Sequence, residues 1–155
     1  MILLNLFVLK KGVPTRWVLL DSWWYYKGVG GGVKNWTARP DIFPNGLDYL
    51  YQQTGWRVQA HNRYWSLDND YLGSCPFTCT HVGLKGRDCL PTSYAFWEDL
   101  FKVNQGWGLV NYEQDWLKDS EQDITMIQNT TWFGRQWLMA MGEAAYQYDL
   151  SIQCM

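Results

Sequence analysis

The sequence predicts an α/β fold in which strand, loop and helix alternate along a single domain. Short apolar segments that end in polar residues recur along the chain, and segments with helical spacing of apolar residues follow them. The 155 residues, of which 47% are hydrophobic, suit one compact domain with a buried core. Strand–helix–strand repeats have right-handed crossovers and parallel strands. We therefore interpret residues 1–155 as one domain of parallel βα units.

The first unit begins with an almost entirely apolar segment, residues 16–21, that ends in Asp21. This pattern predicts a strand buried on both faces, as in parallel sheets. A glycine-rich loop at 28–32 follows, and residues 44–51 then carry apolar side chains at helical spacing. Gly55 is a suitable C-terminal stop for that helix.

The second and third units repeat this order. Residues 56–62 predict a strand, and a helix over 93–103 follows a Thr-Ser pair that can cap it. Residues 107–112 predict the third strand, and a long helix is expected over about 124–148. Residues 150–154 then begin a fourth strand.

Two segments depart from this alternation. Residues 2–9 are apolar but too short to span a bilayer, and the two lysines follow the run, whereas a secretory signal carries its positive charge before it. We interpret the run as a buried strand or a damaged start at least as readily as a signal, so the compartment is open. Two glycosylation sequons, at 35–37 and 129–131, give slight support to a secreted protein. Residues 73–90 form an irregular loop of different composition.

The composition favours a carbohydrate ligand. Eleven Trp, 10 Tyr and 6 Phe make up 17% of the chain, and many of them stand beside Asp, Asn, Arg or His. Flat rings next to hydrogen-bonding groups are what a sugar-binding cleft needs. The net charge of −2 is spread without long runs of one sign, which argues against a nucleic-acid-binding or membrane-binding surface.

Polar residues follow three of the predicted strands, where they end. In parallel α/β sheets, binding and catalytic groups gather at the carboxyl ends of the strands. We therefore expect one polar edge made of Asp21 after the first strand, His61, Asn62 and Arg63 after the second, and Glu113 and Asp115 after the third.

Asp115 is the candidate catalytic residue. A carboxylate at a strand end, framed by Tyr112 and Trp116, is suited to attack an anomeric carbon, as the nucleophile of a retaining glycosidase does. The alternative is that Asp115 caps the next helix. His61 is a candidate acid/base, but no Ser or Cys nucleophile is paired with it in the sequence, so a hydrolase triad is unsupported.

Asp21 is expected to accept hydrogen bonds from sugar hydroxyls, with the adjacent Trp23 and Trp24 forming an aromatic wall. The alternative for this segment is an aromatic cluster that covers the end of the sheet. Asn62 and Arg63 are expected to shape the pocket.

The cysteine-rich loop leaves several interpretations open. Cys75, Cys79, His81 and Cys89 are enough ligands for a structural zinc site, but their spacing matches no established pattern. Disulfide pairing or plain loop thiols are the preferred interpretations. No dinucleotide-binding or phosphate-loop motif occurs, so we expect neither a cofactor nor a metal.

Four segments, LLDSWWY, FPNGLDYLYQQTGW, WGLVNYEQDWL and LSIQCM, together resemble the catalytic barrel of the α-galactosidase-type glycoside hydrolases of clan D and their raffinose-synthase-related members. The resemblance covers residues 15–72 and 91–155 and omits the irregular loop. It implies that the chain is an incomplete (β/α)8 barrel, because a complete barrel takes roughly 200 residues or more.

The resemblance also implies roles for particular residues. Asp115 matches the nucleophile, Asp21 a substrate-binding carboxylate, and Trp23 or Trp24 the pocket aromatic. Two departures put galactose specificity in doubt: Ser22 stands where the family often has a second acidic residue, and Glu113 where it often has Lys. The family's acid/base would lie beyond Met155.

We therefore expect a fragment of a glycoside hydrolase that acts on α-linked sugars by a retaining mechanism and is inactive alone. The alternatives are a non-catalytic carbohydrate-binding protein and a degenerate fragment without a ligand. The expected partners are a carbohydrate and either the missing half of the barrel or a second copy. The candidate substrate-binding residues are Asp21, Trp23, Trp24, His61, Asn62, Arg63, Tyr64, Glu113 and Trp116.

Overall fold

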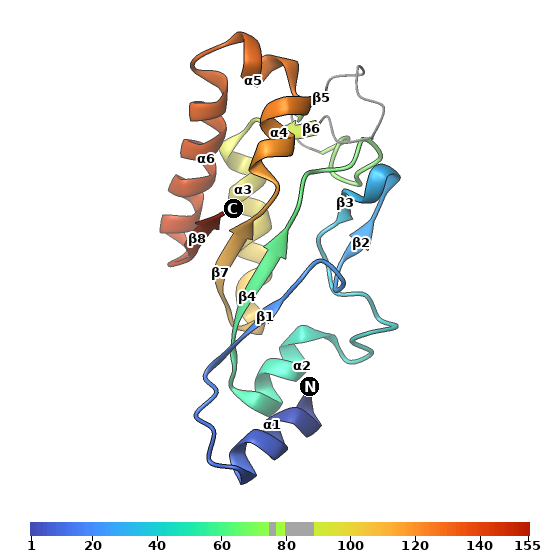
Figure 1. Cartoon of the computed structure of the whole chain (residues 1–155), viewed down its shortest axis with the longest axis vertical. Helices are drawn as coiled ribbons and strands as arrows, with labels where there is room; N and C mark the ends of the chain where they lie inside the picture. Colours follow the sequence, from blue (N-terminus) through green and yellow to red (C-terminus); the bar gives the residue numbers. More distant parts are fainter. Residues whose placement is uncertain (75–76, 80–88) are drawn as a thin grey trace.

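The computed structural model describes residues 1–74, 77–79 and 89–155, with the backbone alone at 77–79 and 122–123. Its centre is a four-stranded sheet, seen through the middle of Figure 1. The strands are β1 (Trp17–Leu20), β4 (Arg57–Asn62), β7 (Leu109–Gln114) and β8 (Ser151–Cys154). They lie in that order and all neighbouring pairs are parallel, which confirms the predicted α/β class with a parallel sheet.

Helices connect these strands. The first connection contains α2 (Gly46–Thr54), the second α3 (Tyr94–Asn104), and the third ends in α6 (Phe133–Gln147). Gly55 ends α2 in the left-handed conformation (φ 63°), as the sequence predicts. A short 3-10 helix, η2 (Gln105–Trp107), precedes β7, so Trp107 lies before the strand rather than in it. The helices α3 and α6 pack against each other on one side of the sheet (Figure 1).

Two antiparallel hairpins, absent from the sequence-based prediction, stand beside the main sheet. One pairs β2 (Tyr26–Lys27) with β3 (Val33–Asn35) around the 3-10 helix η1 (Val29–Gly31), and the other pairs β5 (Phe77–Cys79) with β6 (Cys89–Pro91). A Cβ atom on Gly28 would lie 2.1 Å from Oδ1 of Asp68, so a larger residue there would have to displace the Asp68 side chain from the turn.

An aromatic core fills the space between sheet and helices. Its largest fully buried side chains include four tryptophans, which meet neighbouring rings mostly edge to face; they are Trp24, Trp36, Trp65 and Trp97. The edge-to-face arrangement is favourable because the positive edge of one ring meets the negative face of another. The indole N–H of Trp36 also donates to the backbone oxygen of His61 at 3.0 Å, which ties the core to the end of β4.

The start of α3 provides a test of local folding. The Ser93 side chain accepts a hydrogen bond from the Phe96 backbone N–H at 3.3 Å and so caps the helix. Ser93→Ala should lower the free energy of unfolding by about 1 kcal/mol, because one helical N–H loses its partner. Urea unfolding measures this, and Ser93→Asp, which retains a capping oxygen, should restore most of the loss. Equal loss in both variants would contradict the capping role.

Two strand predictions need correction. Residues 2–9 do not form a buried strand: Ile2–Lys10 is a helix, α1, and Leu3 is 81% exposed. Apolar and polar residues do not alternate in this segment, so its sequence is compatible with a strand and with a helix. The first predicted strand is not buried on both faces, because β1 lies at the edge of the described sheet and exposes Trp17 by 60%. None of the described helices has the length and apolar character needed to cross a membrane.

The single long helix expected over 124–148 is also wrong. The structure has three helices here: α4 (Leu117–Asp123), α5 (Thr125–Asn129) and α6. Thr130 is extended (φ −136°, ψ 135°) and its hydroxyl donates to the Met126 backbone oxygen at 2.7 Å, which ends α5 before α6 begins. The four-residue repeat of apolar side chains within α6 is buried as predicted, at Phe133, Trp137, Met141 and Ala145.

Candidate functional site

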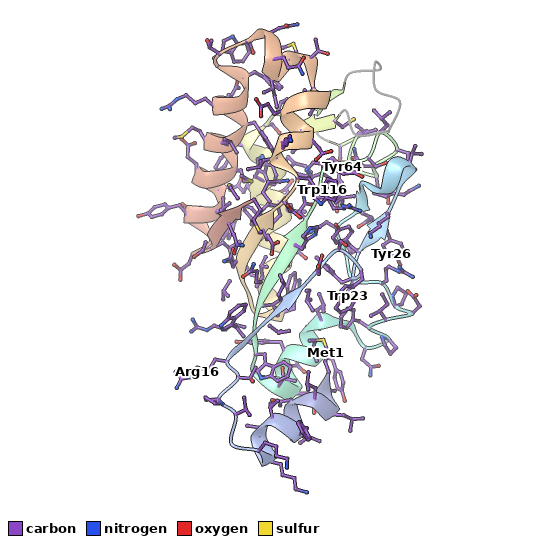
Figure 2. The ribbon with its side chains drawn as sticks, viewed as in Figure 1. Met1, Arg16, Trp23, Tyr26, Tyr64 and Trp116 are labelled. Carbon is purple, nitrogen blue, oxygen red and sulfur yellow. The ribbon has the colours of Figure 1, made fainter. Side chains whose placement is uncertain are left out.

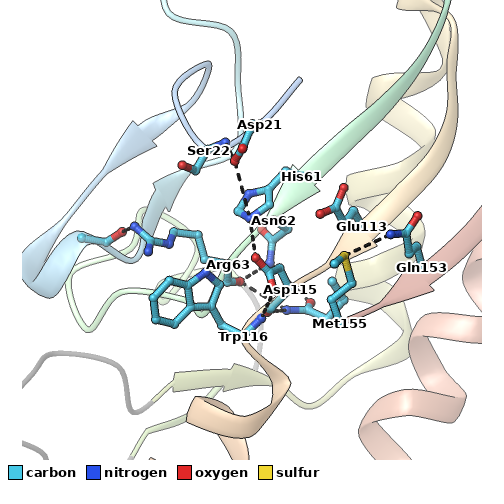
Figure 3. Close-up of polar contacts among 12 residues, drawn as sticks. Asp21, Ser22, His61, Asn62, Arg63, Glu113, Asp115, Trp116, Gln153 and Met155 are labelled. Atoms are coloured by element: carbon cyan, nitrogen blue, oxygen red, sulfur yellow. Dashed lines mark hydrogen bonds and ion pairs between the residues drawn. The ribbon is translucent and has the colours of Figure 1, made fainter. Parts of the chain in front are cut away.

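The carboxyl ends of β1, β4 and β7 lie next to one another at one end of the sheet. The side chains at these strand ends, and those that directly follow them, converge there (Figure 3). In the register of β4 with β7, His61 is paired with Glu113. Residues two apart in a strand share a face, so Asp115 is directed to the same side as Glu113. Asp21, immediately after β1, reaches the group from the neighbouring strand.

Asp115 is held at both carboxylate oxygens. Its Oδ2 lies 3.1 Å from Nε2 of His61, and its Oδ1 accepts the Trp116 backbone N–H at 2.7 Å. Its own N–H donates to the Asn62 backbone oxygen at 2.9 Å. The side chain is nevertheless 30% exposed, so the carboxylate is both fixed in position and accessible.

A buried tyrosine contacts His61 at Nδ1, the ring nitrogen that does not contact Asp115. The hydroxyl of Tyr25 lies 3.2 Å from Nδ1 of His61, and the two rings stack with an interplanar angle of 7°. Burial raises the pKa of Tyr25, so its hydroxyl keeps its proton and can donate it to Nδ1. Nε2 then carries the imidazole proton and donates to Asp115, which gives a continuous chain of hydrogen bonds from Tyr25 to the carboxylate.

Asp21 is a second carboxylate close to His61. Its Oδ1 lies 4.0 Å from Nε2 of His61, and its side chain is 62% exposed. The Ser22 backbone N–H, which donates to the Asp21 carboxylate, and the nearby His61 imidazole lower the pKa of Asp21 below its usual value. Asp21 is therefore an anionic acceptor rather than a proton donor.

Glu113 lies deeper in the same group and is 6% exposed. The Gln59 amide donates to Oε2 of Glu113 at 2.7 Å and to Oε1 of Gln153 at 3.0 Å. The ligand atoms of His61, Glu113 and Asp115 all lie within 4.8 Å of one another. Among the described residues, these three form a group whose ligand atoms lie close enough together to hold a metal ion.

Arg63 forms the outer wall of the site. Its guanidinium carbon lies 4.5 Å from the ring centre of Trp116 and 5.3 Å from that of Tyr64. The guanidinium also donates to the Gly31 backbone oxygen at 3.2 Å, and Tyr64 donates to that of Gly30 at 2.7 Å. These contacts fix the β2–β3 hairpin beside the site, with Tyr64 and Trp116 adjacent to each other in Figure 2.

Several predicted site residues lie elsewhere or are shielded, and Tyr64, which is 3% exposed, is one of the shielded ones. Trp24 is fully buried in the aromatic core, so its ring is not available for stacking on a ligand. Trp23 is 43% exposed but stacks on Phe43 and lines a separate cavity of about 400 Å³ next to α1, toward Met1 in Figure 2. Asn62 is fully buried, and its amide donates to the Arg63 backbone oxygen, so it supports the loop rather than facing a ligand.

Two residues of the site, Tyr25 and Gln59, were not predicted from the sequence. Gln59 precedes His61 by two positions, and that spacing places both on one face of a strand, so the signal was present. Tyr25 carried no such signal, because its contact with His61 depends on how the loop after β1 folds back over the sheet.

The predictions for the cysteine-rich loop are only partly within the described structure. Cys75 and His81 lie outside the described residues, and so does the alternative of a zinc site there. Cys89 is disulfide-bonded and fully buried, which agrees with the preferred interpretation. Cys154 is a free, exposed thiol at the end of β8.

No protein-family model and no curated protein sequence matches this chain. Solved structures do resemble it. A candidate α-N-acetylgalactosaminidase from Bacillus halodurans matches with a TM-score of 0.65 and 9% identity over 97% of this chain. A double variant of a GH36 α-galactosidase from Geobacillus stearothermophilus, in complex with stachyose, matches with a TM-score of 0.57 and 13% identity over 97% of this chain.

The TM-scores show that the fold of this chain is similar to that of part of these two proteins, and at such low identities the similarity concerns the fold alone. The chain spans less than half of the length of either protein, 43% of the first and 25% of the second. The resemblance stated from the sequence is therefore supported at the level of fold.

Proposed function

We propose that this chain carries part of the substrate site of a glycoside hydrolase that acts on α-linked sugars by a retaining mechanism, on parallel βα units that belong to a (β/α)8 barrel. The observation that carries the proposal is the Asp115 carboxylate, which is rigidly held and accessible at the carboxyl end of β7. The similarity in fold to two glycoside hydrolases, one of them bound to stachyose, supports it.

In this proposal, Asp115 attacks the anomeric carbon, the bond from that carbon to the leaving-group oxygen breaks, and a covalent glycosyl ester forms that water later hydrolyses. The hydrogen bond from His61 keeps the carboxylate oriented toward the sugar. Asp21 and Arg63 bind sugar hydroxyls from two sides, and Trp116 supplies an aromatic surface beside them. Trp24 has no part in the site, because it is buried in the core.

The described carboxylates near Asp115 do not supply the proton donor that a glycosidase needs for its leaving group. The pKa of Asp21 is lowered, whereas a general acid requires a raised pKa. Glu113 is buried and already accepts a hydrogen bond from Gln59. We therefore propose that the 155-residue chain by itself binds an α-galactoside without repeated turnover.

The held and accessible Asp115 carboxylate also favours a second candidate function, that of a carbohydrate-binding protein without catalytic activity. An oriented carboxylate beside an arginine and aromatic rings binds a sugar whether or not a proton donor is present. The two functions differ in whether Asp115 reacts with a sugar that carries a good leaving group. A chain that binds no sugar would fit neither and would indicate a degenerate domain.

Asp21→Asn tests the binding half of the proposal. The change removes a charge-assisted hydrogen bond to a sugar hydroxyl, which should weaken stachyose binding by roughly 10- to 100-fold. Isothermal titration calorimetry measures the dissociation constant. Asp41→Asn is the matched control, because Asp41 pairs with Arg39 on the exposed surface. Equal affinities of wild type and Asp21→Asn would remove Asp21 from the site.

A further inference from the structure

The group of side chains at the carboxyl ends of β4 and β7 also has the features of a metal site. We propose that His61, Glu113 and Asp115 bind a divalent transition-metal ion of the Zn²⁺ type. One imidazole nitrogen and two carboxylate oxygens lie within 4.8 Å of one another, and Nε2 of His61 is already 3.1 Å from Oδ2 of Asp115. The proximity follows from the register, which pairs His61 with Glu113, and from the position of Asp115 immediately after the end of β7.

The charge at this position favours a bound cation. Glu113 is 6% exposed, and Asp21 and Asp115 add two further carboxylates at the same edge. Among the described residues, the only basic group within 4.0 Å of any of the three is the His61 imidazole. The Gln59 amide offsets only part of the cost of burying the Glu113 carboxylate without a cationic partner, and a divalent ion would offset that cost directly.

Hydrogen bonds from neighbouring residues orient the three ligands. In metal sites, residues that do not bind the metal orient the ligands in this way. Tyr25 contacts Nδ1 of His61, the Gln59 amide holds one oxygen of Glu113, and the Trp116 N–H holds Oδ1 of Asp115. Such outer partners fix the tautomer and direction of a ligand. Each of these contacts engages one atom of its ligand, and a second nitrogen or oxygen atom of the same side chain remains to bind an ion; the three side chains lie close together in Figure 3.

Metal binding requires a change of tautomer at His61 and a small inward movement of the ligand atoms, because two atoms bound to one Zn²⁺ at about 2.0–2.2 Å lie closer together than 4.8 Å. A metal on Nε2 replaces the hydrogen bond from Nε2 to Asp115 with two bonds to the ion. The neutral imidazole then carries its proton on Nδ1 and donates it to the Tyr25 hydroxyl, which can accept as well as donate. The Tyr25 contact is thus kept in both states.

The ligand set selects the class of ion. Mg²⁺ and Ca²⁺ prefer oxygen ligands alone, whereas a mixture of imidazole and carboxylates suits Zn²⁺ and its neighbours in the transition series. The partial exposure of Asp115 leaves a route by which the ion can enter. This inference does not rest on the proposed function, and the ion would compete with a sugar for Asp115.

The test is calorimetric titration of the 155-residue chain with Zn²⁺, followed by absorption spectroscopy with Co²⁺ in its place. Wild type should bind one equivalent, and the Co²⁺ spectrum should lack a thiolate-to-metal charge-transfer band. Glu113→Gln and His61→Ala should each weaken binding by more than about 100-fold, since each removes a ligand. Tyr25→Phe, which removes only the outer hydroxyl, should weaken it by roughly 10- to 100-fold.

The matched controls are Asp70→Asn, whose carboxylate accepts a hydrogen bond from Asn35, and His81→Ala, at the second histidine of the sequence. Both variants should leave the affinity unchanged. Thermal unfolding separates ligand loss from misfolding, because Zn²⁺ should raise the melting temperature of wild type but not of a folded Glu113→Gln. No binding by wild type would overturn the inference. So would binding that His81→Ala abolishes, or a thiolate band, because either would place the ion in the cysteine-rich loop.

The outcome is separable from that of the proposed function. Sugar binding is measured with EDTA present, where no metal occupies Asp115. Metal binding without sugar binding would overturn the proposed function alone, and sugar binding without metal binding would overturn this inference alone.

Discussion

Asp115→Asn is expected to lower the rate of fluoride release from a fluorinated α-galactosyl fluoride by about a thousandfold or more. Asparagine keeps the size of the side chain and its contact with the Trp116 N–H, but it lacks the negative charge that attacks the anomeric carbon. Fluoride leaves without being protonated, so this substrate tests nucleophilic attack without a general acid. A fluoride-selective electrode or ¹⁹F NMR measures the release, which should amount to one equivalent per wild-type chain.

Stachyose binding by Asp115→Asn, measured with EDTA present, should stay close to that of wild type, because the proposed contacts with Asp21 and Arg63 remain. Asp119→Asn, in the first turn of α4, is the matched control and should release fluoride at the wild-type rate. A rate for Asp115→Asn above about a tenth of the wild-type rate would remove Asp115 as the nucleophile.

Trp97→Ala is expected to lower the free energy of unfolding by about 3–5 kcal/mol. The indole is fully buried and contacts the rings of Trp65, Phe96 and Tyr112, so its removal leaves a cavity at the junction of α3 with β7. Domains are stable by only about 5–15 kcal/mol, so this one change should remove a large part of the total. Urea unfolding followed by tryptophan fluorescence and circular dichroism measures the loss.

Val103→Ala is the control for Trp97→Ala, because Val103 lies on the same helix and is 73% exposed. Its effect should stay within about 0.5 kcal/mol of wild type. Comparable losses in the two variants would contradict the position of α3 over the aromatic core.

The parallel sheet could be predicted from the sequence because each strand is a local pattern. The segments that became β1, β4 and β7 are apolar runs that end in polar residues, and that order is enough to place Asp21, His61 and Asp115 at one end of a parallel sheet. The alternation of strands and helices required no knowledge of distant contacts.

The failed predictions concern properties that depend on neighbours in space. Exposure of Trp17 follows from the position of β1 at the edge of the described sheet, which its own sequence does not encode. Trp24 and Trp23 look equivalent in sequence, yet one is buried among other rings and the other packs on Phe43. The break at Thr130 depends on a side-chain hydrogen bond that competes with helix continuation.

The most direct test of the central claim is the location of the covalent sugar on the wild-type chain. The chain is incubated with the fluorinated α-galactosyl fluoride, and the adduct is located by intact-mass measurement and peptide sequencing in the mass spectrometer. The proposal predicts one sugar per chain, esterified to Asp115, because that carboxylate is both oriented by His61 and accessible at the end of β7. A sugar on Asp21, Glu113 or another carboxylate, or no adduct on a chain that binds stachyose, would contradict it.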